Sequence, residues 1–283
     1  MRSLRESKMV GITRENLAQF NDEGFFLAKG LLDSENDLGP IKAEYKEVLD
    51  KAVLDLQTRG IIENNHMELP FEKRISQVLE ESDGELNKYL DITLPQKDIN
   101  SQTPMHCGPA VFNLIRNSKL LDAVQQFIGS EIYSNPTQHV RIKTPAHYLA
   151  GTTRVLSEID TTVWHQDAGT GTSDADHTNT LTVWISVTEA SLENGCLMVA
   201  PKSHRKGLAL HCHDKRANYS RQSIPERLIG EHREPIETNP GDVIFLSKYI
   251  MHSSLPNLSE NIRWSLDLRY NPIGEPTGRA WFP

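Results

Sequence analysis

The chain has 283 residues, 37% hydrophobic and 24% charged, and carries a formal net charge of −8 at pH 7. This composition is typical of a globular protein with a sizeable buried core and argues against extensive disorder. The acidic balance disfavours nucleic acid or an anionic membrane as a general partner, because both attract basic surfaces. No stretch approaches the roughly 20 apolar residues that span a bilayer, and residues 1–10 lack the apolar segment of a secretory signal. We therefore expect a cytoplasmic protein that spans no membrane.

The first half of the sequence has the residue spacing of helices. Thr13 can cap a short helix, which Gly24 can end before the apolar run at 25–27. From about 37 to 58, apolar residues recur at three- and four-residue intervals, which predicts a long amphipathic helix. Shorter helical patterns follow at about 71–79, 110–116 and 120–128.

Period-2 alternation replaces the helical spacing in the second half. Apolar and more polar side chains alternate at 181–188 and again at 262–270, as expected for strands with two different faces. Shorter β-rich runs lie at 131–134, 139–143, 196–200 and 243–246. Turn signals such as Asn194-Gly195 separate these runs, which favours a sandwich or barrel. We expect one domain over residues 1–283, in which a helical part, about 13–130, packs outside a mainly β core, about 131–272.

Three residues have the chemistry of a metal site. His165 and Asp167 are two positions apart, so on an extended segment their side chains point to the same side. His252, near the end of another strand-like run, supplies a second imidazole. Two histidines and one carboxylate leave three coordination positions open, which suits iron(II) that binds a bidentate co-substrate and dioxygen. The pair alone is weak, because either histidine could be a core or surface residue, and a zinc hydrolase uses the same donors.

Arg263 follows His252 by eleven positions and lies on the polar side of the alternating segment 262–270. An arginine on an interior face needs an anion, because an unpaired buried charge is costly. The distal carboxylate of 2-oxoglutarate is such an anion, and the guanidinium fork matches its two oxygens. The alternative is an ion pair between Arg263 and Asp267 on the surface.

The order of these motifs resembles that of the phytanoyl-CoA dioxygenase family. The similar stretches are 20–32, His165-Gln166-Asp167, 192–197, 201–204, 240–242 and the interval from His252 to Arg263. Together they are spread over nearly the whole chain. The resemblance implies a double-stranded β-helix, or jelly-roll, fold and an oxygenase in which His165, Asp167 and His252 hold Fe2+, with 2-oxoglutarate and O2 as co-substrates.

The resemblance also implies which residues bind the co-substrate. Arg263 is expected to anchor the distal carboxylate of 2-oxoglutarate. Gln166, Trp184 and Ser254 are similar to residues that line the co-substrate pocket, and Ser254 could donate to the same carboxylate. Trp184 could equally be an ordinary residue of the barrel core.

We expect a small-molecule substrate that is hydroxylated, or otherwise oxidised at an unactivated C–H bond, with release of succinate and CO2. Residues 169–177, which are rich in Gly, Thr and Asp, depart from the family pattern and put phytanoyl-CoA as the substrate in doubt. A binding module that has lost the reaction is a further alternative, although it should also have lost a metal ligand. His211-Cys212-His213 could form a separate metal site, but adjacent ligands without a partner pattern are more often a polar loop. The sequence indicates no oligomeric state.

About forty residues separate the strand that ends near Pro201 from the strand that begins near Val243. A connection of this length in a compact domain is usually functional or disordered. Its first half is basic, with the cations Lys202, Arg205, Lys206, Lys215, Arg216 and Arg221. We expect a lid whose positive potential attracts an anionic substrate such as a carboxylate, phosphate or acyl-CoA. A solvated basic loop that binds no ligand is the alternative.

Overall fold

The computed structural model describes residues 11–94, 99–149, 161–213 and 222–279. The α-helices in these ranges are α1 (Arg14–Glu23), α2 (Gly39–Thr58), α3 (Phe71–Glu81), α4 (Asn87–Leu90), α5 (Pro109–Ile115), α6 (Ser118–Ile128) and α7 (Glu226–Ile229). The strands are β1 (Phe25–Ala28), β2 (Ile132–Ser134), β3 (His139–Lys143), β4 (Leu181–Ser186), β5 (Leu197–Ala200), β6 (Cys212–His213), β7 (Gln222–Ser223), β8 (Glu234–Ile236), β9 (Val243–Ser247), β10 (Met251–Ser254) and β11 (Arg263–Pro272). None of these helices combines the length and apolar character needed to cross a membrane.

Local sequence signals set the ends of α1. The Thr13 side chain accepts a hydrogen bond from the backbone N–H of Asn16, and the Asn16 side chain accepts one from the N–H of Thr13. This reciprocal pair is a capping box. Gly24 ends the helix with a φ of 88°, a left-handed conformation that glycine adopts without strain. The predicted change from helix to strand at this point is confirmed, because β1 follows directly.

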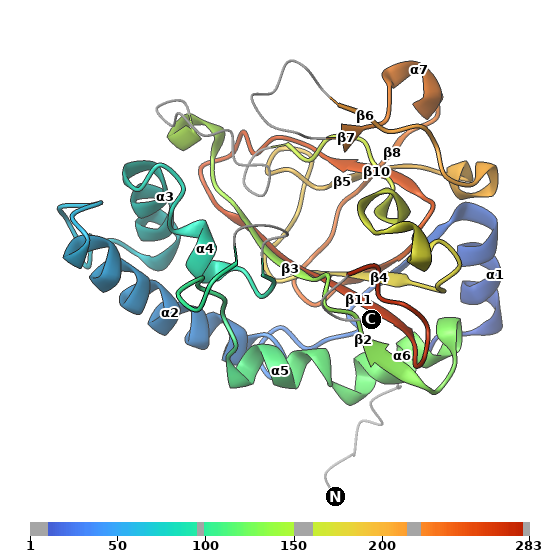
Figure 1. Cartoon of the computed structure of the whole chain (residues 1–283), viewed down its shortest axis with the longest axis horizontal. Helices are drawn as coiled ribbons and strands as arrows, with labels where there is room; N and C mark the ends of the chain where they lie inside the picture. The colour runs from blue at the N-terminus through green and yellow to red at the C-terminus, as the bar shows by residue number, and fades with distance from the viewer. Residues whose placement is uncertain (1–10, 95–98, 150–160, 214–221, 280–283) are drawn as a thin grey trace, which may run out of the picture.

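Two antiparallel sheets form the β part of the molecule. The larger has the strand order β1-β9-β4-β11-β2, with β3 also paired to β11, and the smaller has the order β10-β5-β8. Strands β6 and β7 form a separate pair. Helices α2 to α6 lie on the side of the larger sheet that faces away from β5 and β10 (Figure 1). The helical first half therefore packs outside the β part, as predicted.

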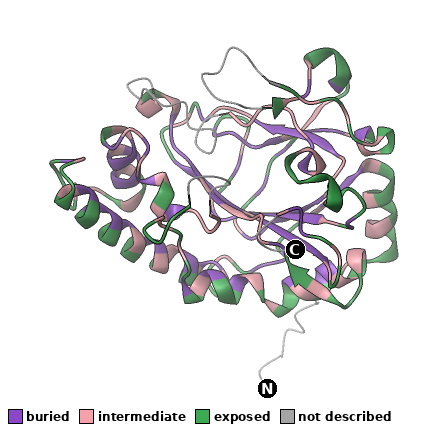
Figure 2. Ribbon diagram, in the orientation of Figure 1, coloured by how far each residue is buried: buried purple, intermediate pink, exposed green. Residues whose placement is uncertain are grey.

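Aromatic and aliphatic side chains join the helices to the outer face of the larger sheet. Tyr45 of α2 lies against Trp264 of β11, with ring centroids 5.1 Å apart. Phe127 of α6 stacks on Phe245 of β9 at 4.8 Å. These residues belong to the largest hydrophobic cluster, which the helices cover from solvent (Figure 2). The opposite face of the sheet is left to line the space between the two sheets.

The inner face is buried, and its β4 and β11 part carries polar side chains beside an apolar cluster that includes Ile244 and Leu246. Every residue of β4 is buried, so the predicted alternation separates an apolar outer side from an inner side with Thr182, Trp184 and Ser186. Strand β11 alternates in the same way, and its inner side carries Arg263 and Arg269. Polar side chains in such a place need partners or ligands, because burial removes their water.

Several short elements were not predicted. Helices α4 and α7 and strands β6, β7 and β8 have two to four residues each. Segments of this length contain too few residues for a period to be recognised. The long elements, by contrast, begin and end close to their predicted bounds.

Candidate metal centre

The structure brings His165, Asp167 and His252 together between the two sheets. One donor atom from each lies within 4.8 Å of the other two. The backbones of the two histidines pair directly, since the N–H of each donates to the carbonyl of the other at 3.0 Å. Residues 87 positions apart are thus held side by side, with ring centroids 4.2 Å apart. Asp167 begins the 3-10 turn Asp167–Thr170 and points to the same space.

Both imidazoles are oriented by a backbone carbonyl. Nδ1 of His165 donates to the carbonyl of Val163 at 2.8 Å, and Nδ1 of His252 donates to that of Ile250 at 3.1 Å. Each Nε2 is then left as a lone-pair donor. Burial, reinforced by the neighbouring His252, lowers the pKa of His165 to about 3, so this ring is neutral near pH 7. Two open Nε2 atoms on neighbouring rings fit a divalent metal ion.

The carboxylate of Asp167 is held by two donors. Arg269 Nη2 donates to Oδ1 at 2.5 Å, and the Thr182 hydroxyl donates to Oδ2 at 2.5 Å. Burial alone would raise the pKa of Asp167, but Arg269 and the two imidazoles outweigh it and keep the pKa below its usual value. The group is therefore ionised and fixed in orientation, as a metal ligand must be. Sequence reasoning did not give Arg269 or Thr182 this role, although both lie on the polar sides of their alternating segments.

Arg263 is a buried cation that has no carboxylate partner in the described part of the chain. Its side chain is 3% exposed, Nη1 donates to the Ser265 hydroxyl at 2.6 Å, and Nε has no hydrogen-bond partner. Within the described residues no carboxylate forms an ion pair with it, so the alternative surface pair with Asp267 is not formed. Burial, together with nearby Arg141, lowers the pKa of Arg263 to about 10, which leaves it charged at pH 7. A buried, charged and open guanidinium is what an anion site requires.

Of the predicted pocket residues, Trp184 lies beside this cation, and Ser254 is bonded to Lys143, the strand neighbour of Arg263. The Arg263 guanidinium carbon is 5.6 Å from the centroid of the Trp184 ring. Lys143, which pairs with Arg263 in the sheet register, extends across to the smaller sheet and donates to the Ser254 hydroxyl at 2.8 Å. That hydroxyl also accepts from the N–H of Thr162, so its own hydrogen is available to an acceptor such as a carboxylate. Sequence reasoning missed Lys143, because its position depends on strand register.

Gln166 points away from the metal ligands on either side of it. Its Nε2 donates to the carbonyls of Gly207 at 2.9 Å and Tyr249 at 2.6 Å. Its Oε1 accepts from the N–H of Ala209 at 2.7 Å. Both amide hydrogens are used, so the side chain braces the backbone behind the metal segment. The structure gives no support to the prediction that Gln166 lines the co-substrate pocket, and strand alternation explains its direction.

His211 also supports the metal segment from behind. Its Nε2 accepts from the backbone N–H of Gln166 at 3.1 Å, while Nδ1 donates to the carbonyl of Ala209 at 2.9 Å. Both ring nitrogens are therefore occupied. Across the part of the chain that the structure describes, the group of His165, Asp167 and His252 is the one set of ligating side chains that converges. The polar-loop interpretation of residues 211–213 thus agrees with the geometry better than a second metal site.

Two of the six cations of the predicted lid face α1. Lys202 forms ion pairs with Asp22 and Glu23 at 3.2 Å, and Arg205 pairs with Asp22. Residues 214–221, which include three more of these cations, lie outside the described residues. The charged-lid hypothesis therefore depends on those three residues and Lys206.

Comparison with known proteins identifies the family. Residues 20–265 match the phytanoyl-CoA dioxygenase (PhyH) family, and the chain belongs to it. The chain is 38% identical over 111 residues to methylphosphonate hydroxylase of Gimesia maris, an alignment that covers 39% of each protein. It is 32% identical over 107 residues to 1-deoxypentalenic acid 11-beta-hydroxylase of Streptomyces exfoliatus, which covers 34% of this chain and 37% of that one. These alignments thus span less than half of either relative.

The fold is also found in solved structures. The epimerase SnoN from nogalamycin biosynthesis, solved in complex with Fe3+, alpha ketoglutarate and nogalamycin RO, superposes with a TM-score of 0.54 at 17% identity. The superposition covers 94% of this chain and 87% of SnoN. The arrangement of helices and antiparallel sheets described above is therefore an established architecture.

Proposed function

We propose that this protein is an iron(II)- and 2-oxoglutarate-dependent oxygenase that oxidises a small-molecule substrate. The proposal is carried by one observation: a possible metal site and an open buried cation lie in the same space between the sheets. Three donor atoms of His165, Asp167 and His252 lie within 4.8 Å of one another, and the same strand-lined space contains the open cation Arg263. Membership of the phytanoyl-CoA dioxygenase family supports the same chemistry.

The chain contributes a defined set of actions to this reaction. Iron(II) at the three ligands supplies dioxygen activation coupled to the decarboxylation of 2-oxoglutarate to succinate and CO2. Arg263, with the hydroxyls of Ser254 and Ser265 and the Lys143 ammonium near it, holds the distal carboxylate of the co-substrate. Both serines neighbour a cation, so their hydroxyls are oriented before the co-substrate arrives.

We assign the β part to the double-stranded β-helix, or jelly-roll, class. In support, successive strands change sheet along much of this part of the chain. Strand β4 lies in the larger sheet, β5 and β8 lie in the smaller, and β9, β10 and β11 lie in the larger, the smaller and the larger. Such alternation is typical of a jelly roll. It places ligands from β10 opposite cations from β11.

A zinc hydrolase would use the same three ligands. That reaction has no need of a buried, unpaired arginine next to the metal, whereas a dicarboxylate co-substrate does. The open Arg263 guanidinium therefore favours the oxygenase.

The proposal is tested by succinate formation. Protein loaded anaerobically with iron(II) is supplied with 2-oxoglutarate and air, and a set of candidate metabolites is screened for stimulated succinate release. The expected result is release that needs iron and is absent in zinc-loaded protein. Hydrolysis of an ester or amide by the zinc form, with no succinate from the iron form, would contradict the proposal.

A further inference from the structure

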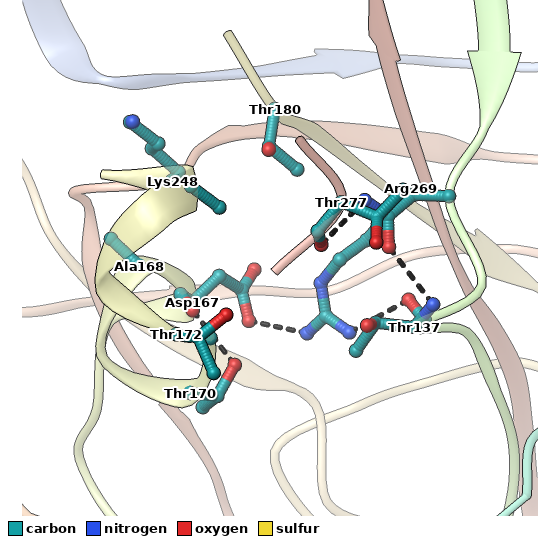
Figure 3. Close-up of a pocket in the computed structure, with 12 residues that line it drawn as sticks. Thr137, Asp167, Ala168, Thr170, Thr172, Thr180, Lys248, Arg269 and Thr277 are labelled. Atoms are coloured by element: carbon teal, nitrogen blue, oxygen red, sulfur yellow. Dashed lines mark hydrogen bonds and ion pairs between the residues drawn. The ribbon is translucent and has the colours of Figure 1, made fainter. Parts of the chain in front are cut away.

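A small cavity borders Asp167 on the side of Arg269 (Figure 3). Its volume is about 40 Å³. A cavity needs about 10–15 Å³ to hold one water, so a group of a few heavy atoms fits here and a large body does not. Asp167 and Arg269 form one side of the cavity, and the side chains of Thr170, Thr172 and Thr180 line other parts of it.

Arg269 presents an unused donor at this cavity. Nη2 donates to Asp167 and Nη1 donates to the carbonyl of Thr137 at 2.9 Å, but the buried Nε–H has no hydrogen-bond partner. The residue is only 6% exposed, and a buried N–H without an acceptor is costly. The Thr180 hydroxyl likewise forms no hydrogen bond with the described residues. Lys248 is directed elsewhere, since its Nζ donates to the carbonyl of Asp176.

The cavity lies at the other end of β11 from the proposed co-substrate anchor. Arg263 and Arg269 are on the same face and six residues apart, a rise on the order of 20 Å along a strand. Asp167 contacts Arg269 and lines the cavity, so the cavity adjoins the proposed metal site. Part of the cavity wall comes from residues 168–175, within the Gly- and Thr-rich stretch that departs from the family pattern. The cavity is therefore placed to contact a substrate rather than 2-oxoglutarate.

Metal binding changes the charge balance at Arg269. Without a metal, the carboxylate of Asp167 neutralises the guanidinium. A divalent ion on Asp167 shares that carboxylate, and the next carboxylate, Asp267, is 3.9 Å from Arg269 Nη2. Arg269 then shares Asp167 with the metal and keeps an Nε–H that has no hydrogen-bond partner.

We propose that this cavity binds the anionic group of the substrate, a carboxylate or a phosphonate, through Arg269 and the Thr180 hydroxyl. The inference rests on the proposed function, because it takes the neighbouring metal site as the reacting centre. The small volume limits the anion to a compact head group, and binding there holds the adjoining carbon next to the metal. The names of the two relatives above, a methylphosphonate and a pentalenic acid hydroxylase, agree with this class.

Calorimetric titration with methylphosphonate tests the proposal. The protein is loaded with Mn2+, which accepts the same ligands as Fe2+ and avoids turnover in air, and with 2-oxoglutarate. Acetate is titrated in a second arm to separate a carboxylate from a phosphonate preference, and methanol serves as the neutral control. We expect either anion to bind and methanol not to bind. In Arg269→Gln the affinity should fall by about ten- to a hundredfold, as for loss of a charge-assisted hydrogen bond.

A matched control separates anion binding from support of the metal ligand. Thr182→Val removes the other donor to Asp167 but leaves the cavity intact, since Thr182 does not line it. We expect this variant to weaken Mn2+ binding while methylphosphonate affinity in the loaded protein stays at the wild-type value. Thr180→Val should weaken the anion and leave Mn2+ affinity unchanged. Equal effects of Arg269→Gln and Thr182→Val on the anion would overturn the proposal.

A measurement on the unaltered protein covers the case in which Arg269→Gln fails to fold. Bound Mn2+ should strongly broaden the 31P resonance of methylphosphonate, because the cavity adjoins Asp167. A resonance that stays sharp, with acetate also failing to bind, would overturn the inference. The proposed function is judged separately, since the visible band of the anaerobic iron(II) and 2-oxoglutarate complex needs no substrate. A protein that forms that band but binds neither anion refutes only the anion cavity.

Discussion

Arg263 and Arg269 lie on one strand and one face, and both are buried, yet their surroundings differ. Arg269 is paired with Asp167 at 2.5 Å, whereas Arg263 has a serine hydroxyl as its hydrogen-bond partner within the described residues. Burial lowers the pKa of Arg263 to about 10, with Arg141 adding to the effect. Burial also acts on Arg269, but Asp167 and Asp267 outweigh it and raise the pKa of that guanidinium.

Burial by itself therefore does not identify an anion site. What identifies it is a buried cation whose donors exceed the acceptors supplied by the chain. Arg263 has no carboxylate partner within the described residues, so it suits a full carboxylate such as that of 2-oxoglutarate. Arg269 is paired with Asp167 and Asp267 and has an Nε–H without a hydrogen-bond partner within the described residues. We therefore propose different anions for the two arginines.

The largest expected effect comes from removing the ligand between the two arginines. Asp167→Ala should abolish iron-dependent succinate formation, because the metal loses its carboxylate and Arg269 loses the nearer of its two carboxylate partners. Succinate release and iron content are the measurements, with circular dichroism to confirm the fold. Turnover at the wild-type rate in this variant would show that Asp167 is not needed as a metal ligand. His252→Ala should also abolish succinate formation, while the ion pair between Arg269 and Asp167 stays intact.

The second-largest expected effect is on 2-oxoglutarate affinity, which should depend on Arg263 and not on Arg269. Arg263→Ala should weaken 2-oxoglutarate by about ten- to a hundredfold, the usual effect of losing hydrogen bonds to a charged group. Arg263→Lys should restore only part of the affinity, because an ammonium lacks the planar fork. Anaerobic titration of the iron form with 2-oxoglutarate gives the dissociation constant. If affinity survived in Arg263→Ala and fell in Arg269→Gln, the roles would have to be exchanged.

Acid should destabilise the metal-free protein through His165, whose pKa the fold lowers. The folded chain holds the pKa of His165 at about 3 against 6.5 when unfolded, so the unfolded chain binds the proton first as pH falls. Stability of the metal-free protein should therefore be complete above pH 6.5 and decrease towards pH 3, by about 1.4 kcal/mol per pH unit at most from this group. Urea unfolding at pH 6.5 and 4.5 measures the change. His165→Asn should show a smaller loss, and an identical loss in that variant would refute the assignment.

The smallest expected effect tests whether the lid assists the anion. Lys215→Ala with Arg216→Ala should raise the Michaelis constant for an anionic substrate, and the penalty should shrink as salt approaches about 0.1 M. Lys202→Ala is the matched control, because Asp22 and Glu23 already neutralise that cation. Equal constants for the double variant and its parent at low salt would leave Arg269 as the sole proposed anchor.

Regular elements were predictable because their periods are local. Alternation at 181–188 and 262–270 gave β4 and β11 and placed Arg263 on the polar side. Contacts set by strand register were not predictable in this way. Lys143 reaches Ser254 from 111 positions away, and Arg269 reaches Asp167 from 102 positions away. The pairing that brings them together is specified by the whole sheet rather than by either segment.

At Gln166, the family motif and strand alternation lead to different expectations for the side chain. Its place inside the metal motif suggested contact with the co-substrate, yet alternation turns its side chain to the backbone of Gly207, Ala209 and Tyr249. The period that correctly placed His165 and Asp167 on one side also predicts this direction. Strand alternation therefore describes the direction of the Gln166 side chain better than its place in the motif does.

The central claim is that His165, Asp167 and His252 form an iron site that takes 2-oxoglutarate as a chelate. Anaerobic addition of iron(II) and 2-oxoglutarate, followed by visible absorption, tests it most directly. We expect a weak charge-transfer band in the wild-type protein and no band in His252→Ala. In Arg263→Ala the band should form but need much more 2-oxoglutarate. A wild-type protein that binds iron(II) without this band, or an unchanged band in His252→Ala, would contradict the account.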